Sequence, residues 1–153
     1  EADTVVSGQG KSKACFATLA ERKTRFYIAM KMSDRRAETM ENAIVAALSA
    51  FPPQLVKTIT CDRGTEFANW RRIEERLHCE VYFADPYCAW QKGTNENLNG
   101  LLREFYPKGR NLSRVAPATL KRNLALLNAR PRKVLYFHSA QELWDFELNS
   151  CCT

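Results

Sequence analysis

The order of β-favouring and helical segments along the chain is the feature that most constrains its fold. Three runs rich in β-branched and aromatic residues come first, and strand-like and helical segments alternate after them. The predicted order is β-β-β-α-β-α-β-α, followed by two further helices. The expected strands cover residues 3–7, 14–19, 25–32, 56–61 and 79–84. This order predicts an α/β sandwich, in which helices cover both faces of a central five-stranded mixed sheet.

The helices are predicted from apolar residues at helical spacing and from the residues that end them. The first opens near Ser33 or Asp34 and stops at Pro52-Pro53. A capping box at residues 139–142 marks the start of the last helix. The other helices are expected at residues 70–77, at a segment that begins with Glu96, and at residues 117–128.

Three carboxylates occupy positions that a buried or merely solvated acid rarely takes. Asp3 opens a short β-branched run, and Asp62 ends another run just before Gly64. Glu96 lies at the start of an amphipathic helix. Carboxylates at strand ends and helix starts can converge on a metal ion, so these three residues are candidates for one site.

The helix that carries Glu96 has a clear apolar stripe. At ~100° per residue, four apolar side chains fall on one face, and Glu96 lies nearly opposite the centre of that face. The apolar residues are Leu98, Leu101, Leu102 and Phe105. Asn99, Gly100 and Arg103 share the polar face, and this set is suited to a phosphate backbone. For a lone Glu96 the alternative is a solvated glutamate stabilised by the helix dipole, but the other two acids favour the functional interpretation.

The topology indicates how the acids meet. Asp3 and Asp62 become neighbours if the first and fourth strands pair in parallel through the intervening helix. The helix of Glu96 then needs only to cross that edge. Three acids close together repel and raise one another's pKa unless a divalent cation neutralises them. The sequence therefore predicts a site for a hard, oxygen-preferring ion, Mg²⁺ or Mn²⁺.

Length and composition fit one ordinary domain. The chain has 153 residues, and its hydrophobic content of 45% is enough to form a core. No stretch approaches ~20 consecutive apolar residues, and the first residues lack the order of a signal peptide. We expect a soluble intracellular protein with no membrane partner. Because the chain begins inside a strand pattern, we also expect residues 1–153 to be a single domain from a longer protein.

The cysteines show no metal-binding pattern. They are Cys15, Cys61, Cys79, Cys88, Cys151 and Cys152. No C-x-x-C pair and no histidine at ligand spacing accompanies them, so we expect reduced thiols. Cys15, Cys61 and Cys79 lie in strand-like runs and are expected to be small buried hydrophobic side chains. Cys151-Cys152 is expected to be a frayed tail.

The net charge of +6 is unevenly distributed. No Asp or Glu occurs from residue 105 to residue 141. The basic residues of this stretch include Lys108, Arg110, Arg114, Lys121, Arg122, Arg130, Arg132 and Lys133. A nucleic acid is the predicted partner of such a surface. The alternative is a solvated basic surface that only favours solubility.

Sequence blocks around the three acids are long enough to compare with known families. The clearest joins Asp85-Pro86-Tyr87 to Gln91-Lys92-Gly93-Thr94-Asn95-Glu96-Asn97-Leu98-Asn99-Gly100-Leu101-Leu102-Arg103. The others are Asp3-Thr4-Val5-Val6, Cys61-Asp62-Arg63-Gly64-Thr65-Glu66-Phe67, Pro107-Lys108-Gly109 and Leu127-Asn128-Ala129-Arg130-Pro131-Arg132-Lys133. These blocks resemble the catalytic domain of bacterial insertion-sequence transposases of the IS-thirty type, and the resemblance covers nearly the whole chain.

The resemblance implies a ribonuclease H-like fold and a DDE triad, which falls on Asp3, Asp62 and Glu96. Two Mg²⁺ or Mn²⁺ ions ~3.5 to 4 Å apart would be bridged by Asp3. Water attack then cuts DNA at the transposon end, and the freed 3′ hydroxyl attacks target DNA. Two positions depart from the family pattern: Arg63 stands where Asn is common, and Ala2 stands where Gly is common.

The resemblance also implies partners and a setting. The partners are transposon-end DNA and target DNA, bound by a homo-oligomer that acts at the nucleoid in the bacterial cytoplasm. The family usually carries an upstream DNA-binding domain, which we expect to be missing from residues 1–153.

Polar residues near the acids are expected to contact DNA. These residues are Lys92, Asn95, Asn99, Arg103 and, beside the second acid, Arg63. Trp90 either stacks on a displaced base or belongs to the core. Glu66 is expected to be structural, and Asp85 is expected to be a turn or strand-end residue rather than a metal ligand.

Three functions remain open from the sequence. The first is an active transposase core, a metal-dependent polynucleotidyl transferase. The second is a metal-dependent nuclease of the same fold that cuts without strand transfer. The third is a non-catalytic DNA-binding or assembly module derived from a transposase, and the intact acids argue against it.

Overall fold

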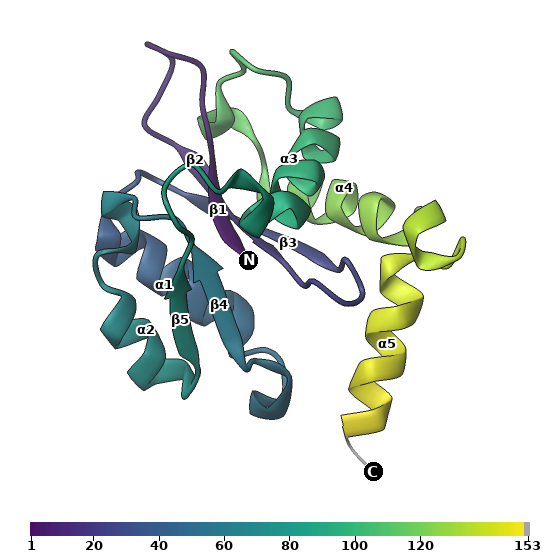
Figure 1. Cartoon of the computed structure of the whole chain (residues 1–153). Coiled ribbons are helices and arrows are strands. Elements are labelled where there is room, and N and C mark those ends of the chain that lie inside the picture. The colour runs from purple at the N-terminus through teal and green to yellow at the C-terminus, as the bar shows by residue number, and fades with distance from the viewer. Residues whose placement is uncertain (152–153) are drawn as a thin grey trace.

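The strands form two β-sheets (Figure 1). The computed structural model describes residues 1–151. A three-stranded antiparallel sheet contains β1 (Ala2–Val6), β2 (Cys15–Ala20) and β3 (Tyr27–Met32), in that order. A two-stranded parallel sheet contains β4 (Thr58–Cys61) and β5 (Glu80–Phe83). The predicted strands are confirmed, with their ends shifted by one or two residues.

The prediction of a single five-stranded sheet is wrong. Within residues 1–151, β1 and β4 pack against each other but are not joined in one hydrogen-bonded sheet. β4 has four residues, and its backbone pairs with β5. A side-chain hydrogen bond connects the two sheets instead. The Thr4 hydroxyl of β1 donates to Oε1 of Glu66, which follows β4 in the chain, at 3.2 Å. Asp3 and Asp62 are therefore brought together by packing rather than by a parallel strand pair.

The predicted helices are confirmed. In the part of the chain that the structure describes, the α-helices are α1 (Ala37–Leu48), α2 (Trp70–Leu77), α3 (Gly93–Phe105), α4 (Pro117–Ala129) and α5 (Ala140–Cys151). α1 begins later than expected, at Ala37 rather than near Ser33 or Asp34. The reason is a turn before the helix, in which Asp34 Oδ1 accepts hydrogen bonds from the Arg36 N–H at 3.1 Å and the Thr39 hydroxyl at 2.8 Å.

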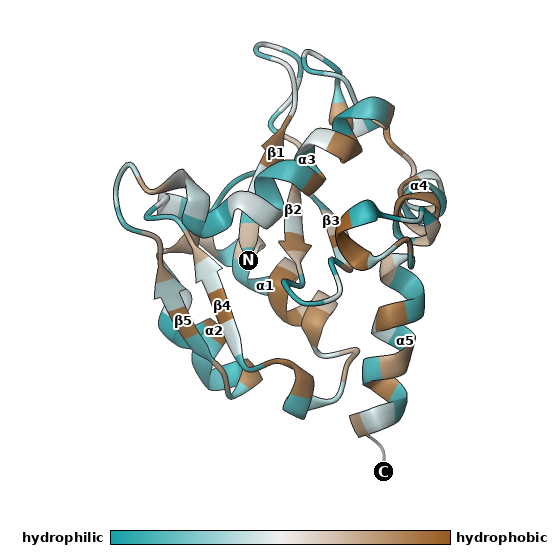
Figure 2. Ribbon diagram, turned by 45° about the vertical axis from the view of Figure 1, so that its right-hand side comes forward, coloured by the Kyte–Doolittle hydropathy of each residue, from teal (hydrophilic) through white to brown (hydrophobic). Residues whose placement is uncertain are grey.

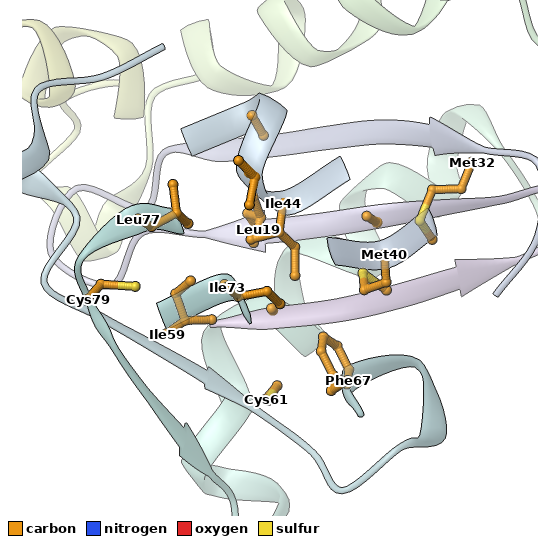
Figure 3. Packing of buried hydrophobic residues seen from close by; sticks show 14 of the residues in the cluster. Leu19, Met32, Met40, Ile44, Ile59, Cys61, Phe67, Ile73, Leu77 and Cys79 are labelled. Atoms are coloured by element: carbon orange, nitrogen blue, oxygen red, sulfur yellow. The ribbon is translucent and has the colours of Figure 1, made fainter. Parts of the chain in front are cut away.

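Hydrophobic clusters lie on both faces of the three-stranded sheet, as predicted. One cluster joins the sheet to α1, α2 and β4 (Figure 3), and the other joins it to α3 and α4. Figure 2 shows the hydrophobic stretches of β2 and α1 in the interior. β2 contributes to both clusters, with Cys15, Ala17 and Leu19 in the first and Phe16 and Ala20 in the second. Every residue of β2 is buried, because both of its faces are covered and both of its edges are paired.

The last helix is fixed at its start by the predicted capping box. The Glu142 N–H donates to Ser139 Oγ at 3.2 Å, and the Ser139 N–H donates to Glu142 Oε2 at 2.7 Å. Trp144 then packs on Phe26 and Phe51, with ring centroids 5.1 Å apart in both pairs. α5 is thereby attached to the turn before β3 and to the segment after α1.

The cysteines behave largely as expected. Cys15, Cys61 and Cys79 are buried and unbridged, and burial raises the pKa of Cys61 to about 12. Cys151 is the last residue of α5 rather than part of a frayed tail, and Cys152 lies outside the described residues. No helix within residues 1–151 is both long enough and apolar enough to cross a membrane.

Leu102 tests the packing that holds α3 on the sheet. Leu102→Ala should lower the free energy of unfolding by about 2–5 kcal/mol, because this side chain is fully buried in the cluster under α3. Leu126→Ala on α4 is the matched control, since Leu126 is 55% exposed and should cost less than about 1 kcal/mol. Urea denaturation measures both changes, and equal losses would contradict this packing.

Candidate active site

The structure brings all three predicted acids to one pocket. Asp3 comes from β1, Asp62 follows β4 directly, and Glu96 lies in the first turn of α3. α3 begins at Gly93, before Glu96, because a 3-10 turn over Ala89–Lys92 leads directly into it. The pocket is lined by Asp3, Asp62, Arg63, Ala84, Asp85, Pro86, Tyr87, Cys88, Lys92 and Glu96.

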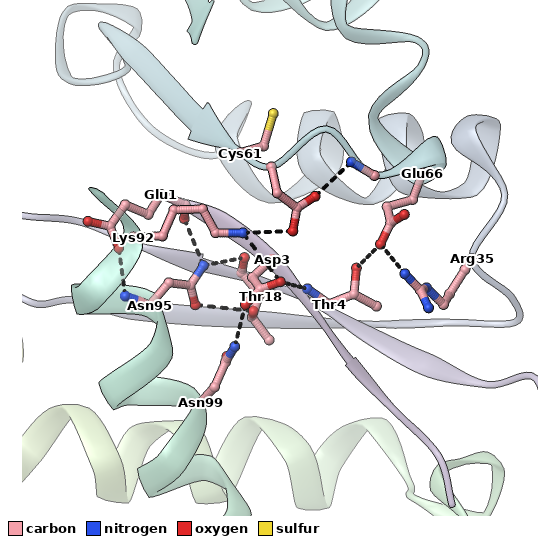
Figure 4. A network of polar contacts seen from close by, with 12 residues as sticks. Glu1, Asp3, Thr4, Thr18, Arg35, Cys61, Glu66, Lys92, Asn95 and Asn99 are labelled. Atoms are coloured by element: carbon pink, nitrogen blue, oxygen red, sulfur yellow. Dashed lines mark hydrogen bonds and ion pairs between the residues drawn. The ribbon is translucent and has the colours of Figure 1, made fainter. Parts of the chain in front are cut away.

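Asp3 is held in a fixed orientation by hydrogen bonds to both of its carboxylate oxygens (Figure 4). Its Oδ1 accepts from the Thr4 N–H at 2.8 Å, and its Oδ2 accepts from Asn99 Nδ2 at 3.0 Å. Asn99 Oδ1 in turn accepts from the Tyr27 hydroxyl at 2.6 Å. Burial raises the pKa of Tyr27, so the hydroxyl stays protonated and remains a donor. This chain of contacts joins β1, β3 and α3 behind the first acid.

Asp62 is held by the turn that follows β4. Its Oδ1 accepts from the Gly64 N–H at 2.9 Å. A Cβ atom at position 64 would lie 2.5 Å from Glu66 Oε2 and 2.8 Å from Asp62 Oδ1, so a larger residue would have to displace these carboxylates. Glu66 is buried and accepts from Thr4 and from Arg35, whose Nη2 lies 2.5 Å from Glu66 Oε1. The structural role expected for Glu66 agrees with these contacts.

Lys92 lies between the first two acids. Its ammonium nitrogen is 3.1 Å from Asp62 Oδ2 and 3.5 Å from Asp3 Oδ1. Figure 4 shows Lys92 beside Asp3. The Lys92 side chain is only 13% exposed, and the Asp3 side chain is less exposed than that of Asp62, so water screens the contact with Asp3 less than the contact with Asp62. The sequence suggested that Lys92 contacts DNA, whereas here its charge is used by two of the three acids. Asp3 and Asp62 therefore already share one positive charge.

Glu96 stands apart from this pair. It is exposed on the pocket wall, and no ion pair or side-chain hydrogen bond of its carboxylate occurs within residues 1–151. In the same described range, no three Asp, Glu, His or Cys side chains are close enough to form a ready-made metal site. The first two acids are thus preorganised around a cation, and the third faces the same space from α3.

The prediction that Asn95 contacts DNA is wrong. Asn95 is fully buried, and its amide group bonds to Thr18 of β2: Oδ1 accepts from the Thr18 hydroxyl at 3.2 Å, and Nδ2 donates to the Thr18 carbonyl at 3.3 Å. Its Nδ2 and backbone N–H also bond to Glu1, at 3.1 and 2.7 Å. The spacing of Asn95 from Leu98 and Leu102 places it on the apolar side of α3, and this signal was available in the sequence.

The other polar residues divide into two groups. Asn99 and Arg103 bond mainly to the protein: Asn99 positions Asp3, and Arg103 donates to the carbonyls of Val6 at 3.2 Å and Tyr106 at 3.4 Å. Burial lowers the pKa of Arg103. Arg63 is exposed on the pocket wall and remains a candidate for DNA contact. Asp85 is exposed in a turn and accepts from Gln91 Nε2 at 3.1 Å.

Comparison with solved structures identifies the fold. In overall fold the chain matches the catalytic core domain of BIV integrase, with a TM-score of 0.72 at 16% identity, over 99% of this chain and 96% of that one. A structure of the HTLV-2 integrase catalytic core domain in complex with magnesium (trimeric form) matches with a TM-score of 0.64 at 14% identity, over 92% and 91%. The fold is therefore the ribonuclease H-like fold of retroviral integrase cores.

Sequence comparison identifies the family. Residues 1–89 match the integrase core domain, and the chain belongs to this family. It is 37% identical to a probable transposase for insertion-like sequence element IS1161 of Streptococcus salivarius, over 95% of this chain and 41% of the relative. It is 36% identical to a transposase for insertion sequence element IS30C of Escherichia coli, over 88% and 35%. The chain thus spans about two fifths of the length of these relatives, and the suggested resemblance is confirmed.

Asn95 offers a test of the contact between α3 and β2. Asn95→Ala should lower the free energy of unfolding by about 1–3 kcal/mol, because it leaves the buried Thr18 hydroxyl without its acceptor. Asn97→Ala is the control on the same helix, because Asn97 is exposed and its loss should change stability by about 0.5 kcal/mol or less. Equal effects in thermal or urea unfolding would contradict the assignment.

Lys92 offers a test of the charge balance in the pocket. Without divalent metal, Lys92→Met should lower the unfolding temperature by about 2–4 °C, because Asp3 and Asp62 lose their shared counter-charge. Mn²⁺ should remove this difference by supplying the missing charge. Lys23→Met is the control, since its ion pair with Glu147, at 2.6 Å, lies elsewhere on the surface. A deficit in Lys92→Met that Mn²⁺ leaves unchanged would contradict this role.

Proposed function

We propose that this chain is the catalytic core of a DDE transposase, which cuts DNA at transposon ends and joins the freed 3′ hydroxyl to target DNA. The observation that carries the proposal is the convergence of Asp3 and Asp62 on one cationic group in a pocket that Glu96 also lines. The family match and the transposases among its relatives support the same reaction. We assign Asp3, Asp62 and Glu96 as the catalytic acids.

The donor set of the pocket fits a hard divalent cation. Asp3 and Asp62 present carboxylate oxygens within 3.5 Å of a common point, which the ammonium of Lys92 marks. Carboxylate oxygen is the ligand that Mg²⁺ and Mn²⁺ prefer. We propose that Asp3 and Asp62 hold the cations together with Glu96, and that Mg²⁺ is the natural one. When bound, such ions activate the attacking oxygen and stabilise the leaving oxygen.

The residues around the acids supply orientation. The Thr4 N–H and Asn99 fix Asp3, and the Gly64 N–H fixes Asp62, so neither carboxylate has to be ordered when substrate arrives. With a cation bound there, Asp3 and Asp62 would no longer need Lys92 as their counter-charge. The ammonium of Lys92 is then available for a phosphate oxygen of the DNA, as the sequence suggested.

The proposed substrate is double-stranded DNA that carries a transposon end, together with a second duplex as target. The acid-free basic stretch from residue 105 to residue 141 provides positive charge for such a polyanion. Two DNA ends must be held together for joining, so we propose that the active assembly contains more than one copy of the protein. We place this reaction at the bacterial nucleoid.

Strand transfer by the full-length protein tests the proposal. With Mg²⁺ or Mn²⁺, the wild type should join a 3′-hydroxyl transposon end to a second duplex. Asp62→Asn and Glu96→Gln should each reduce the rate of DNA joining by at least about a thousandfold. The reason is that catalytic residues act as a unit, so the loss of one costs nearly as much as the loss of all. Glu104→Gln is the control on α3, because Glu104 lies on the surface and pairs with Arg130 at 3.1 Å. It should join at the wild-type rate.

Other outcomes identify the alternative functions. Cleavage that depends on Asp62 but yields no joined product would indicate a nuclease of the same fold. Binding of DNA ends with neither cleavage nor joining, unchanged by Asp62→Asn, would indicate a non-catalytic module. Full activity of the Glu96→Gln variant would remove Glu96 from the proposed triad.

A further inference from the structure

A second, basic groove lies beside the carboxylate pocket and has no role in the chemistry described above. It is lined by Arg22, Arg25, Trp90, Gly93, Thr94, Asn97, Leu98, Arg132 and Val134. The two hollows share the start of α3: Lys92 and Glu96 line the carboxylate pocket, whereas Thr94 and Asn97 line the groove. They are therefore separated by about the width of one helix, roughly 10 Å.

The groove carries more positive charge than the protein neutralises. Within residues 1–151 no acidic residue lines it, and of its three arginines only Arg22 is paired with a carboxylate, that of Glu1, at 3.3 Å. The Arg25 guanidinium donates to the hydroxyl of Thr94. Arg132 donates to the carbonyls of Arg25 and Leu127 at 3.2 and 2.9 Å. These two arginines are thus held in place by neutral acceptors, which do not offset their positive charge.

Arg132 shows that this charge is poorly compensated. Its buried Nε atom has no hydrogen-bond partner within the described residues 1–151. Burial lowers the pKa of Arg132, and the neighbouring charges of Arg130 and Arg25 lower it further. An anion in the groove would relieve this repulsion. Guanidinium groups in fixed positions favour phosphate, because they donate several hydrogen bonds in one plane.

Trp90 adds an aromatic surface to the same groove. The side chain is 74% exposed, so the core interpretation of this residue is wrong. It lies in the 3-10 turn just before α3, next to Lys92 of the carboxylate pocket. An exposed indole beside fixed arginines is the combination with which proteins bind single strands, through stacked bases and neutralised phosphates. Bases within a duplex are already stacked on each other and do not offer a free face.

We propose that this groove binds a single DNA strand that leaves the carboxylate pocket, with Arg22, Arg25 and Arg132 at its phosphates and Trp90 stacked on an unpaired base. The proposal rests on the proposed function, because the strand is the one next to the cleavage point. It adds a strand-holding site on the other side of α3 from the acids.

The experiment measures binding of a labelled single-stranded oligodeoxythymidine to the full-length protein by fluorescence anisotropy in EDTA. Trp90→Ala should weaken binding about 5- to 150-fold, the effect expected for loss of one stacked base. Phe146→Ala is the matched control, since Phe146 is also exposed but lies on α5 outside the groove. It should bind as the wild type does.

A salt titration tests the arginines separately. Arg22→Ala should reduce the slope of log affinity against log salt by about 0.7, the value for one lost phosphate contact on a single strand. Arg36→Ala is the matched control, because Arg36 is likewise exposed and paired with one acid, Asp34, at 3.2 Å, yet lies outside the groove. It should leave the slope unchanged.

Several results would overturn the proposal. Equal affinities for Trp90→Ala and Phe146→Ala would remove the stacking role, and equal slopes for Arg22→Ala and Arg36→Ala would remove the phosphate role. If duplex DNA of the same length bound as tightly, and lost as much affinity in Trp90→Ala, the groove would not be a single-strand site. Because these measurements need no metal and no joining, they are independent of the Asp62→Asn result that tests the catalytic function.

Discussion

The burial of β2 on both faces is the constraint on which the rest of the structure depends. Both edges of this strand are paired and both faces are covered, so each polar group on it must be satisfied by protein. Thr18 is the polar side chain in the strand, and it is fully buried. Asn95, in the first turn of α3, accepts a hydrogen bond from the Thr18 hydroxyl and donates one to the Thr18 carbonyl. The position of α3 on the sheet, and hence of Glu96 one residue later, follows from this requirement.

The second constraint is electrostatic. Asp3 and Asp62 come from different sheets and would repel each other in the same pocket without a positive charge between them. Lys92 provides that charge from the turn that leads into α3. The contact therefore joins β1, the end of β4 and α3 at one point, and it marks where a cation is stabilised. Trp90 of the same turn lines the basic groove, so this short segment contributes one residue to each of the two pockets.

Much of the fold was predictable from the sequence because its signals are local. The alternation of apolar residues marked the strands, the spacing of Leu98 and Leu102 marked α3, and Ser139 with Glu142 marked the start of α5. The sheet was not predictable in this way. Whether β1 and β4 exchange hydrogen bonds depends on contacts between distant segments, such as the hydrogen bond from Thr4 to Glu66, which are 62 positions apart.

The candidate site shows the same division. The three acids were predictable from the sequence as candidates, since strand ends and a helix start are encoded by neighbouring residues, and the structure places them at one pocket. The prediction that Asn95 contacts DNA missed its burial, although the helical spacing of Asn95 from Leu98 and Leu102 contained that information. The sequence also offered no means to place Lys92 between two acids or to gather Arg22, Arg25 and Arg132 in one groove. Those positions depend on segments distant in the chain, and only packing of the helices on both faces of the sheet decided them.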